Sequence, residues 1–193
     1  ITITGGIFVE GDIKATPLTN TLILAIGGIL ASIIGTTGAS VLLIRPLIRT
    51  NKERRRTTHI FVFFILIVSN VGGTLLPVGD PPLFMGYLYG VPFFWTLIHL
   101  WPIWLTAVSI LLLVFFIWDN FAYKSEAKTD IAKDDQNQTR LRVTGSFNFV
   151  LILGVLMAVV FLKDYKTEHG VLAMGWLQQP VMVGLALLSF VID

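Results

Sequence analysis

HIFVFFILIVSNVGGTLLPVGDPPLFMGYLYG, residues 59–90, is the stretch of sequence that decides the fold. It is apolar enough to enter a membrane, yet it holds three prolines within six positions, Pro77, Pro81 and Pro82. A proline inside a helix removes one backbone N–H and clashes with the carbonyl four residues back, at a cost of about 3 kcal/mol or more. We therefore expect two half-helices, with unwound backbone at 70–80. The first would be about 18 Å long, which places the break near the middle of a ~30 Å hydrocarbon core.

The composition is that of an integral membrane protein. Hydrophobic residues make up 54% of the 193 positions and charged residues 13%, and there is no cysteine. A soluble domain carries roughly twice that charged fraction. These values exclude a disordered segment, a disulfide scaffold and a soluble enzyme. The net charge is only +2 and the basic residues are confined to loops, so a nucleic-acid partner is excluded as well.

A second unusual stretch is apolar over residues 17–49, which is too long for one span. It is interrupted by the small and hydroxyl residues of 35–40, GTTGAS. Two arms, about 18–34 and 41–49, would form a re-entrant helical hairpin with this cluster at its tip, which is tolerated only inside protein or beside a wet cavity. The alternative is one full span that ends near Ile34, followed by a short interfacial helix.

The remaining apolar runs predict ordinary spans at 100–118, 146–162 and 171–192. The chain begins without methionine and ends within an apolar run, so we expect it to be a portion of a longer transporter. The predicted organisation is a first-repeat portion, a connector and the start of a second repeat. Their ranges are 1–122 (hairpin 17–49, broken helix 59–90, span 100–118), 123–145 and 146–193.

Loop charges predict the orientation. Residues 49–56 and 119–142 each hold five lysines and arginines. Because lysine and arginine near span ends mark the cytoplasmic side, we expect loops 49–58 and 119–145 to be cytoplasmic in a multi-pass protein of the cell (inner) membrane.

Asp80 is the only formally charged residue between 57 and 118. An ionised carboxylate near the bilayer centre costs a few kcal/mol on insertion scales, so such residues are functional by default. Desolvation favours its neutral form and a bound cation favours its ionised form, so it could hold either a proton or a small cation. Hard cations prefer oxygen ligands, which backbone carbonyls and the side chains of Ser69, Asn70 and Thr74 could supply. The alternative is that Asp80 simply caps the second half-helix, with Pro81 at its first position.

Residues 69–82, SNVGGTLLPVGDPP, resemble the Ser-Asn-x-Gly-Gly…Pro-x-Gly-Asp motif of the ion transporter superfamily. That group includes NhaD-type sodium/proton antiporters, ArsB-type arsenite permeases, the P protein and citrate transporters. The resemblance implies an all-α membrane fold, half of an inverted-repeat transporter, in which a re-entrant hairpin meets a broken transmembrane helix. It places the substrate site at Asn70 and Asp80 and the hairpin-tip motif at Thr36, Thr37 and Ser40. The full set of expected ion- or substrate-binding residues is Ser69, Asn70, Gly72, Gly73, Thr74, Gly79, Asp80, Thr36, Thr37 and Ser40.

These features favour a secondary transporter that exchanges a sodium ion for protons at Asp80. A sodium- or proton-coupled anion carrier, for citrate, a dicarboxylate or arsenite, is the alternative, because glycines and half-helix N-termini favour anions. A non-transporting membrane scaffold would leave the acid and the prolines unexplained. No nucleophile–base pair, HExxH, Walker loop or thiolate cluster is present, so we expect neither enzymatic activity nor a cofactor besides the transported ions. The expected partners are the lipid bilayer and a small inorganic ion or anion, and a homodimer is among the possible assemblies.

Overall fold

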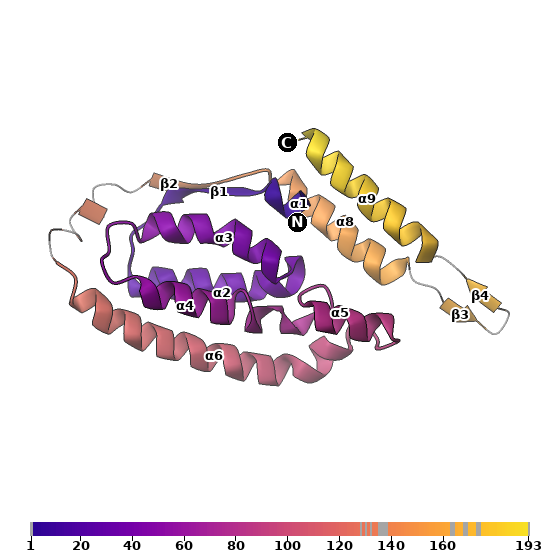
Figure 1. Ribbon diagram of the computed structural model, residues 1–193, viewed down its shortest axis with the longest axis horizontal. Helices are drawn as coiled ribbons and strands as arrows, with labels where there is room; N and C mark the ends of the chain where they lie inside the picture. The colour runs from indigo at the N-terminus through magenta and orange to yellow at the C-terminus, as the bar shows by residue number, and fades with distance from the viewer. Residues whose placement is uncertain are drawn as a thin grey trace. The chain divides into compact units, whose positions relative to one another are not determined.

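The computed structural model divides into two units, residues 9–142 and residues 1–8 with 143–193 (Figure 1). The described residues are 2–127, 129, 131, 133–134, 139–162, 165–167, 170–172 and 175–192.

The described chain is mostly helical. The larger unit contains α2 (Pro17–Ile34), α3 (Thr36–Thr50), α4 (Thr58–Ile67), the 3-10 helix η1 (Val71–Leu75), α5 (Pro81–Leu88) and α6 (Trp95–Lys124). Short strands correct the expectation of an all-α chain: β1 (Phe8–Asp12) pairs with β2 (Thr139–Thr144), and β3 (Tyr165–Thr167) pairs antiparallel with β4 (Gly170–Leu172). The sequence of β2, TRLRVT, alternates polar and apolar side chains, which is the strand period.

Helices α2 and α3 form an antiparallel hairpin. Pro17 opens α2, and the hydroxyl of Thr16 caps it by accepting the N–H of Thr19 at 3.2 Å. Gly35 ends it with φ of +83°, a left-handed conformation that suits glycine. At the base, the side chains of Asn20 and Asn51 exchange two hydrogen bonds, of 2.9 and 2.8 Å. The interruption is therefore one residue, not the predicted six, because a positive φ at one glycine suffices to reverse the chain.

The helix that begins at Thr58 is broken, as the prolines predict. It ends at Ile67, three residues before the expected Asn70, and continues as the short η1 and then as extended backbone at Leu76. Helix α5 starts at Pro81, with prolines at its first two positions, where the absent N–H groups would have had no helical partner.

The two sides of this break are pressed together at Gly73 and Gly79. A Cβ on Gly73 would lie 2.7 Å from the carbonyl oxygen of Gly79, and a Cβ on Gly79 would collide with the carbonyl group of Gly73. Contacts this short essentially never occur, so no larger residue fits at either position. The motif glycines therefore allow the backbone to fold back on itself.

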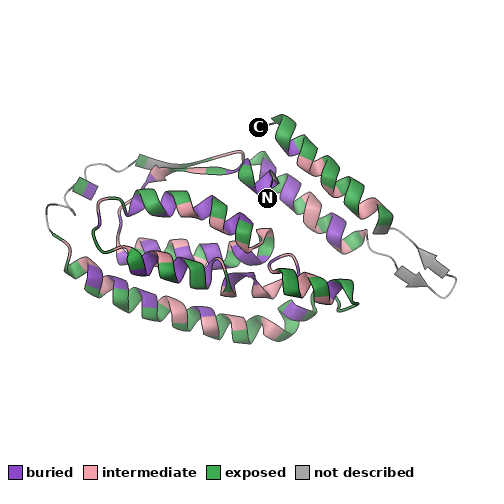
Figure 2. Cartoon of the chain, viewed as in Figure 1, coloured by how far each residue is buried: buried purple, intermediate pink, exposed green. Residues whose placement is uncertain are grey.

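Three segments are long and apolar enough to cross a membrane, within the part of the chain that the structure describes. They are Pro17–Ile34, Thr58–Leu75 and Trp95–Lys124. The last, α6, is longer than the predicted span 100–118, and only 11% of its most apolar window is buried inside the protein. Figure 2 shows this helix as largely exposed along its length. Such a continuous apolar surface is expected for a helix that faces lipid.

A buried polar cluster connects the base of the hairpin with the start of α4 and the end of α6. Asp119 is fully buried and accepts hydrogen bonds from Arg54 at 2.5 and 3.1 Å and from Asn20 at 3.2 Å. His59 Nε2 lies 2.8 Å from the same carboxylate. Because a buried charge without a partner is costly, this cluster fixes the relative positions of α2, α4 and α6.

The smaller unit consists of α1 (Thr2–Gly5), α8 (Phe147–Phe161) and α9 (Gly175–Ile192), which pack on one another. Ser189 donates a buried hydrogen bond of 2.7 Å to Asn148 and so joins α9 to α8. The apolar parts of α8 and α9 are shorter than the three candidate spans.

Replacing Gly79 with alanine should destabilise the fold, because its Cβ would meet backbone that cannot move away. We expect a loss of about 1–3 kcal/mol or more, the usual range for overpacking. Thermal unfolding in detergent micelles would measure it. The matched control is Gly86→Ala in α5, where the nearest atom to the new Cβ would be 3.8 Å away, so that stability should be unchanged or slightly higher. Equal melting temperatures for the two variants would contradict the close packing at the break.

Replacing Asp119 with asparagine should leave the buried Arg54 with only the carboxylate of Glu126, 3.9 Å from its Nε, as a counter-charge. Breaking a buried ion pair costs about 3–5 kcal/mol of stability. For a chain of this size, a loss of about 3 kcal/mol lowers the melting temperature by roughly 6–12 °C. The control is Asn120→Ala on the next position of α6, which removes only a bond to the carbonyl of Phe116 on the same helix. A melting temperature within 2 °C of the parent protein would show that the cluster is not structural.

Candidate functional site at the helix break

Asp80 lies where the extended backbone meets α5. Its φ and ψ of −144° and 133° are those of an N-cap, but its carboxylate makes no capping hydrogen bond. The next two residues are prolines without N–H groups, and the N–H of Leu83 bonds to the backbone carbonyl of Asp80 instead, at 3.1 Å. The side chain of Asp80 therefore does not cap α5, contrary to the alternative drawn from the sequence.

The Asp80 carboxylate is half-buried, and no residue in the described part of the chain donates a hydrogen bond to it or forms an ion pair with it. A carboxylate inside an apolar protein is normally paired or hydrogen-bonded. This acid is thus available to a ligand.

The hairpin tip contacts the break directly. The N–H of Thr36, the first residue of α3, donates to the carbonyl of Gly79 at 3.1 Å. Further along α3, the hydroxyls of Ser40 and Ser69 are hydrogen-bonded to each other at 2.8 Å. Four of the predicted residues are therefore brought together in two pairs, next to Asp80 in the first case and at the end of α4 in the second.

Two carbonyl groups of the broken segment accept hydrogen bonds from side chains of neighbouring helices. Gly72 O accepts hydrogen bonds from the hydroxyl of Ser32 on α2 and from the indole of Trp104 on α6, the latter at 3.3 Å. Leu75 O accepts from the hydroxyl of Thr96 at 2.8 Å. Exposed carbonyls of the unwound segment were expected as ligands for a cation. Those of Gly72 and Leu75 are instead hydrogen-bonded to side chains, which compensates the lost helical bonds.

The other predicted residues differ in their surroundings. Thr74 Oγ1 donates to the carbonyl of Val71 within η1, at 2.9 Å, and is half-buried. Thr37 and Asn70 are exposed, and no side chain or backbone group in the described ranges hydrogen-bonds to their side chains. Their amide and hydroxyl groups could therefore contact a ligand or solvent.

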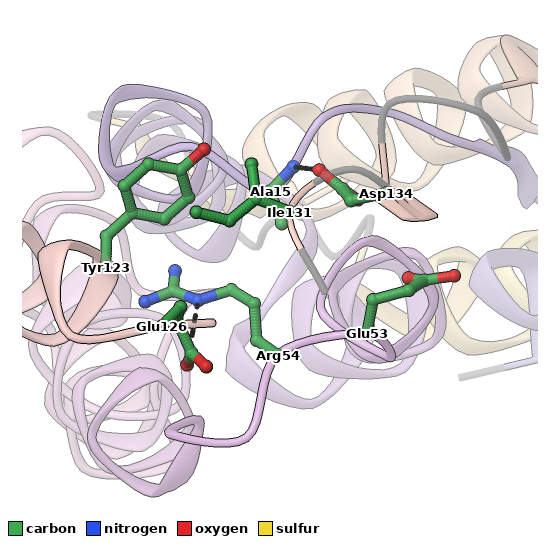
Figure 3. Close-up of a pocket in the computed structure, with 7 residues that line it drawn as sticks. All are labelled: Ala15, Glu53, Arg54, Tyr123, Glu126, Ile131 and Asp134. Carbon is green, nitrogen blue, oxygen red and sulfur yellow. Dashed lines mark hydrogen bonds and ion pairs between the residues drawn. The ribbon is translucent and has the colours of Figure 1, made fainter. Parts of the chain in front are cut away.

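The polar cluster around Asp119 was not predicted from the sequence, because Asp119 begins a charged stretch and His59 begins an apolar one. Next to this cluster lies a cavity of about 10 Å³, which has room for about one water molecule (Figure 3). It is lined by Ala15, Glu53, Arg54, Tyr123, Glu126, Ile131 and Asp134. Arg54 Nε is buried there without a hydrogen-bond partner in the described chain. The size of this cavity suits a structural water rather than a substrate.

The comparisons with known proteins support the interpretation of the chain as a transporter. The model of the family described as "Putative citrate transport" matches residues 1–193. No curated protein and no solved structure is significantly similar to the chain. The match covers every residue, including the proline-rich break, Asp80 and the small-residue tip of the hairpin. The chain therefore belongs to the citrate-transport family and is a multi-pass membrane protein of the secondary-transporter type.

Proposed function

We propose that the chain forms part of a cation-coupled carrier for citrate or a similar small carboxylate, with the coupling cation at Asp80. The family match supports the carboxylate as substrate and so favours the second of the two hypotheses drawn from the sequence. The observation that carries the cation site is the Asp80 carboxylate, which has no protein partner in the described chain.

The charges decide which ion Asp80 would hold. A second negative charge next to an unpaired carboxylate is repelled, so citrate itself is not its partner. A cation or a proton compensates the carboxylate and lowers the cost of its desolvation. Prolines at the first two positions of α5 also remove N–H donors that would otherwise attract an anion to this helix terminus.

The substrate would lie on the exposed polar side chains beside the break. Asn70 and Thr37 carry N–H and O–H donors that are free to bind a carboxylate. Each follows a residue at which the hairpin meets the broken helix. Asn70 follows Ser69, which is hydrogen-bonded to Ser40, and Thr37 follows Thr36, which donates to Gly79. The cation at Asp80 and the anion would then attract each other, which couples their binding.

The hairpin α2–α3 would be re-entrant in this proposal, with its tip at Gly35 near the membrane centre and its base at Asn20 and Asn51. The contact of the hairpin tip with Gly79 supports this placement. It puts the tip and the break of the other helix at the same depth in the membrane. Helices α8 and α9 would open a second repeat of inverted topology.

Sodium/proton antiport remains the second candidate. The observation in its favour is the same unpaired acid, since one carboxylate that binds either a proton or a cation is sufficient for exchange.

Replacement of Asp80 with asparagine should abolish cation-coupled citrate uptake. In proteoliposomes, radiolabelled citrate uptake driven by a sodium or proton gradient should fall to the level of empty vesicles, because the amide cannot compensate a cation. The control is Glu10→Gln, which removes an equal charge from an exposed position. Gradient-driven uptake by the Asp80 variant at the parent rate would overturn the proposal.

The two transport candidates differ in their need for citrate. With a pH-sensitive dye inside vesicles, a sodium pulse without citrate should move no protons through a citrate carrier. Proton release on sodium addition alone, lost in the Asp80→Asn variant, would identify an antiporter instead.

Cysteine labelling can test the proposed orientation, because the chain has no native cysteine. We expect Arg55→Cys and Lys124→Cys to react with an impermeant maleimide from the cytoplasmic side only. Val91→Cys, in the turn before α6, should react from the opposite side. All three positions are exposed. Labelling of Arg55→Cys and Lys124→Cys from opposite sides would refute the even number of crossings between them.

A further inference from the structure

A groove of about 390 Å³ lies at the start of α4, and the proposed transport mechanism does not use it. Its lining residues are Arg55, Arg56, Thr58, His59, Val62, Phe63 and Trp118. All of them belong to the larger unit, and they come from the loop before α4, the first two turns of α4 and the end of α6.

The groove has a charged end and an apolar end. Residues four apart on a helix lie on one face, about 6 Å apart along its axis, so Val62 follows Thr58 and Phe63 follows His59 away from the arginines. Trp118 forms part of the apolar lining and stacks on His59, with ring centroids 6.1 Å apart. Val62 and Trp118 are 47% and 57% exposed, so the apolar end is open to the surroundings of the protein.

The three consecutive arginines before α4 have different roles. Arg54 is buried and is neutralised by Asp119. The loop that follows is fixed by its backbone, since the N–H groups of Arg55 and Arg56 donate to Glu126 at 3.3 and 2.9 Å. The guanidinium group of Arg56 is exposed, and no carboxylate in the described ranges lies within ion-pair distance of it.

Two further features add positive potential at the charged end. The N-terminus of α4 has no side-chain cap, so its N–H groups contribute their partial positive charge. Arg55 also lines the groove there. The complementary ligand is anionic at one end and apolar at the other.

We propose that this groove binds an anionic phospholipid, with the headgroup phosphate at Arg55 and Arg56 and the upper acyl chain along Val62 and Trp118. Basic residues directly beside a membrane span attract anionic headgroups, and tryptophan is enriched at the level where headgroups meet hydrocarbon. A free phosphate would match only the charged end, and a neutral lipid only the apolar end. The lipid would hold the start of α4 at the membrane surface, at the other end of the broken helix from Asp80.

The test is lipid binding by the full chain in detergent, measured by native mass spectrometry. The protein is titrated with phosphatidylglycerol and with phosphatidylcholine of the same acyl chains, with inorganic phosphate as competitor. Two variant pairs separate charge from shape. Arg55→Gln/Arg56→Gln is compared with Arg45→Gln/Arg49→Gln, which removes two exposed arginines of α3 that do not line the groove. Val62→Trp, which fills the groove, is compared with Ile65→Trp at an exposed position of α4 outside it.

Phosphatidylglycerol should bind the parent protein more tightly than phosphatidylcholine. The Arg55/Arg56 variant should bind phosphatidylglycerol at least about fivefold more weakly, which corresponds to about 1 kcal/mol for the exposed guanidinium group of Arg56. Val62→Trp should also lose binding, while the Arg45/Arg49 and Ile65 variants stay within threefold of the parent.

Three results would overturn the proposal. Equal losses in the two arginine pairs would show a diffuse charge effect, and unchanged binding by Val62→Trp would show that no acyl chain enters the groove. Displacement of phosphatidylglycerol by inorganic phosphate at a similar concentration would identify a phosphate site without a lipid.

Discussion

The structure depends on how the broken helix satisfies its backbone polar groups. A helix that stops at Ile67 and resumes at Pro81 leaves carbonyl and N–H groups without their helical partners, and hydrocarbon offers none. Side chains from the helices packed around the break replace them: Ser32 and Trp104 at Gly72, and Thr96 at Leu75. The hairpin α2–α3 and helix α6 are therefore required for the break to exist.

The opposite end of the same helices is held by charge rather than by backbone bonds. Asp119 joins Arg54, His59 and Asn20, so the base of the hairpin, the start of α4 and the end of α6 are fixed to one buried carboxylate. At the break, by contrast, Asp80 has no such partners in the described chain. One acid is fully compensated by the protein and the other is not. This difference separates a structural carboxylate at the end of the apolar run from a candidate ligand-binding one in its middle.

The break and the hairpin could be predicted because their causes are local. Three prolines in six residues exclude a continuous helix whatever packs around them, and a lone small-residue cluster inside an apolar run marks a reversal. The sequence did not reveal that Gly35 alone makes the reversal, since the neighbouring Thr36 is equally compatible with a helix start. Nor did it reveal which carbonyls are engaged, because Trp104 and Gly72 are 32 positions apart. The Asp119 cluster was missed for the same reason: its members are unremarkable alone and are explained only by contacts between distant positions.

The family assignment and the chemistry of the break together restrict which ligands the proposed site can bind. The family description names citrate, which is a multiply charged anion, whereas the ionisable residue at the break, Asp80, is itself an acid. Both can belong to one mechanism only if a cation lies between them or binds first, because two negative charges a few ångströms apart in a poorly solvated site repel each other by several kcal/mol at an effective dielectric of about 20. In the proposed carrier, Asp80 would thus make substrate binding conditional on the cation. In this proposal, an inverted second repeat would place further donors opposite Asn70 and Thr37 and so complete the proposed anion site.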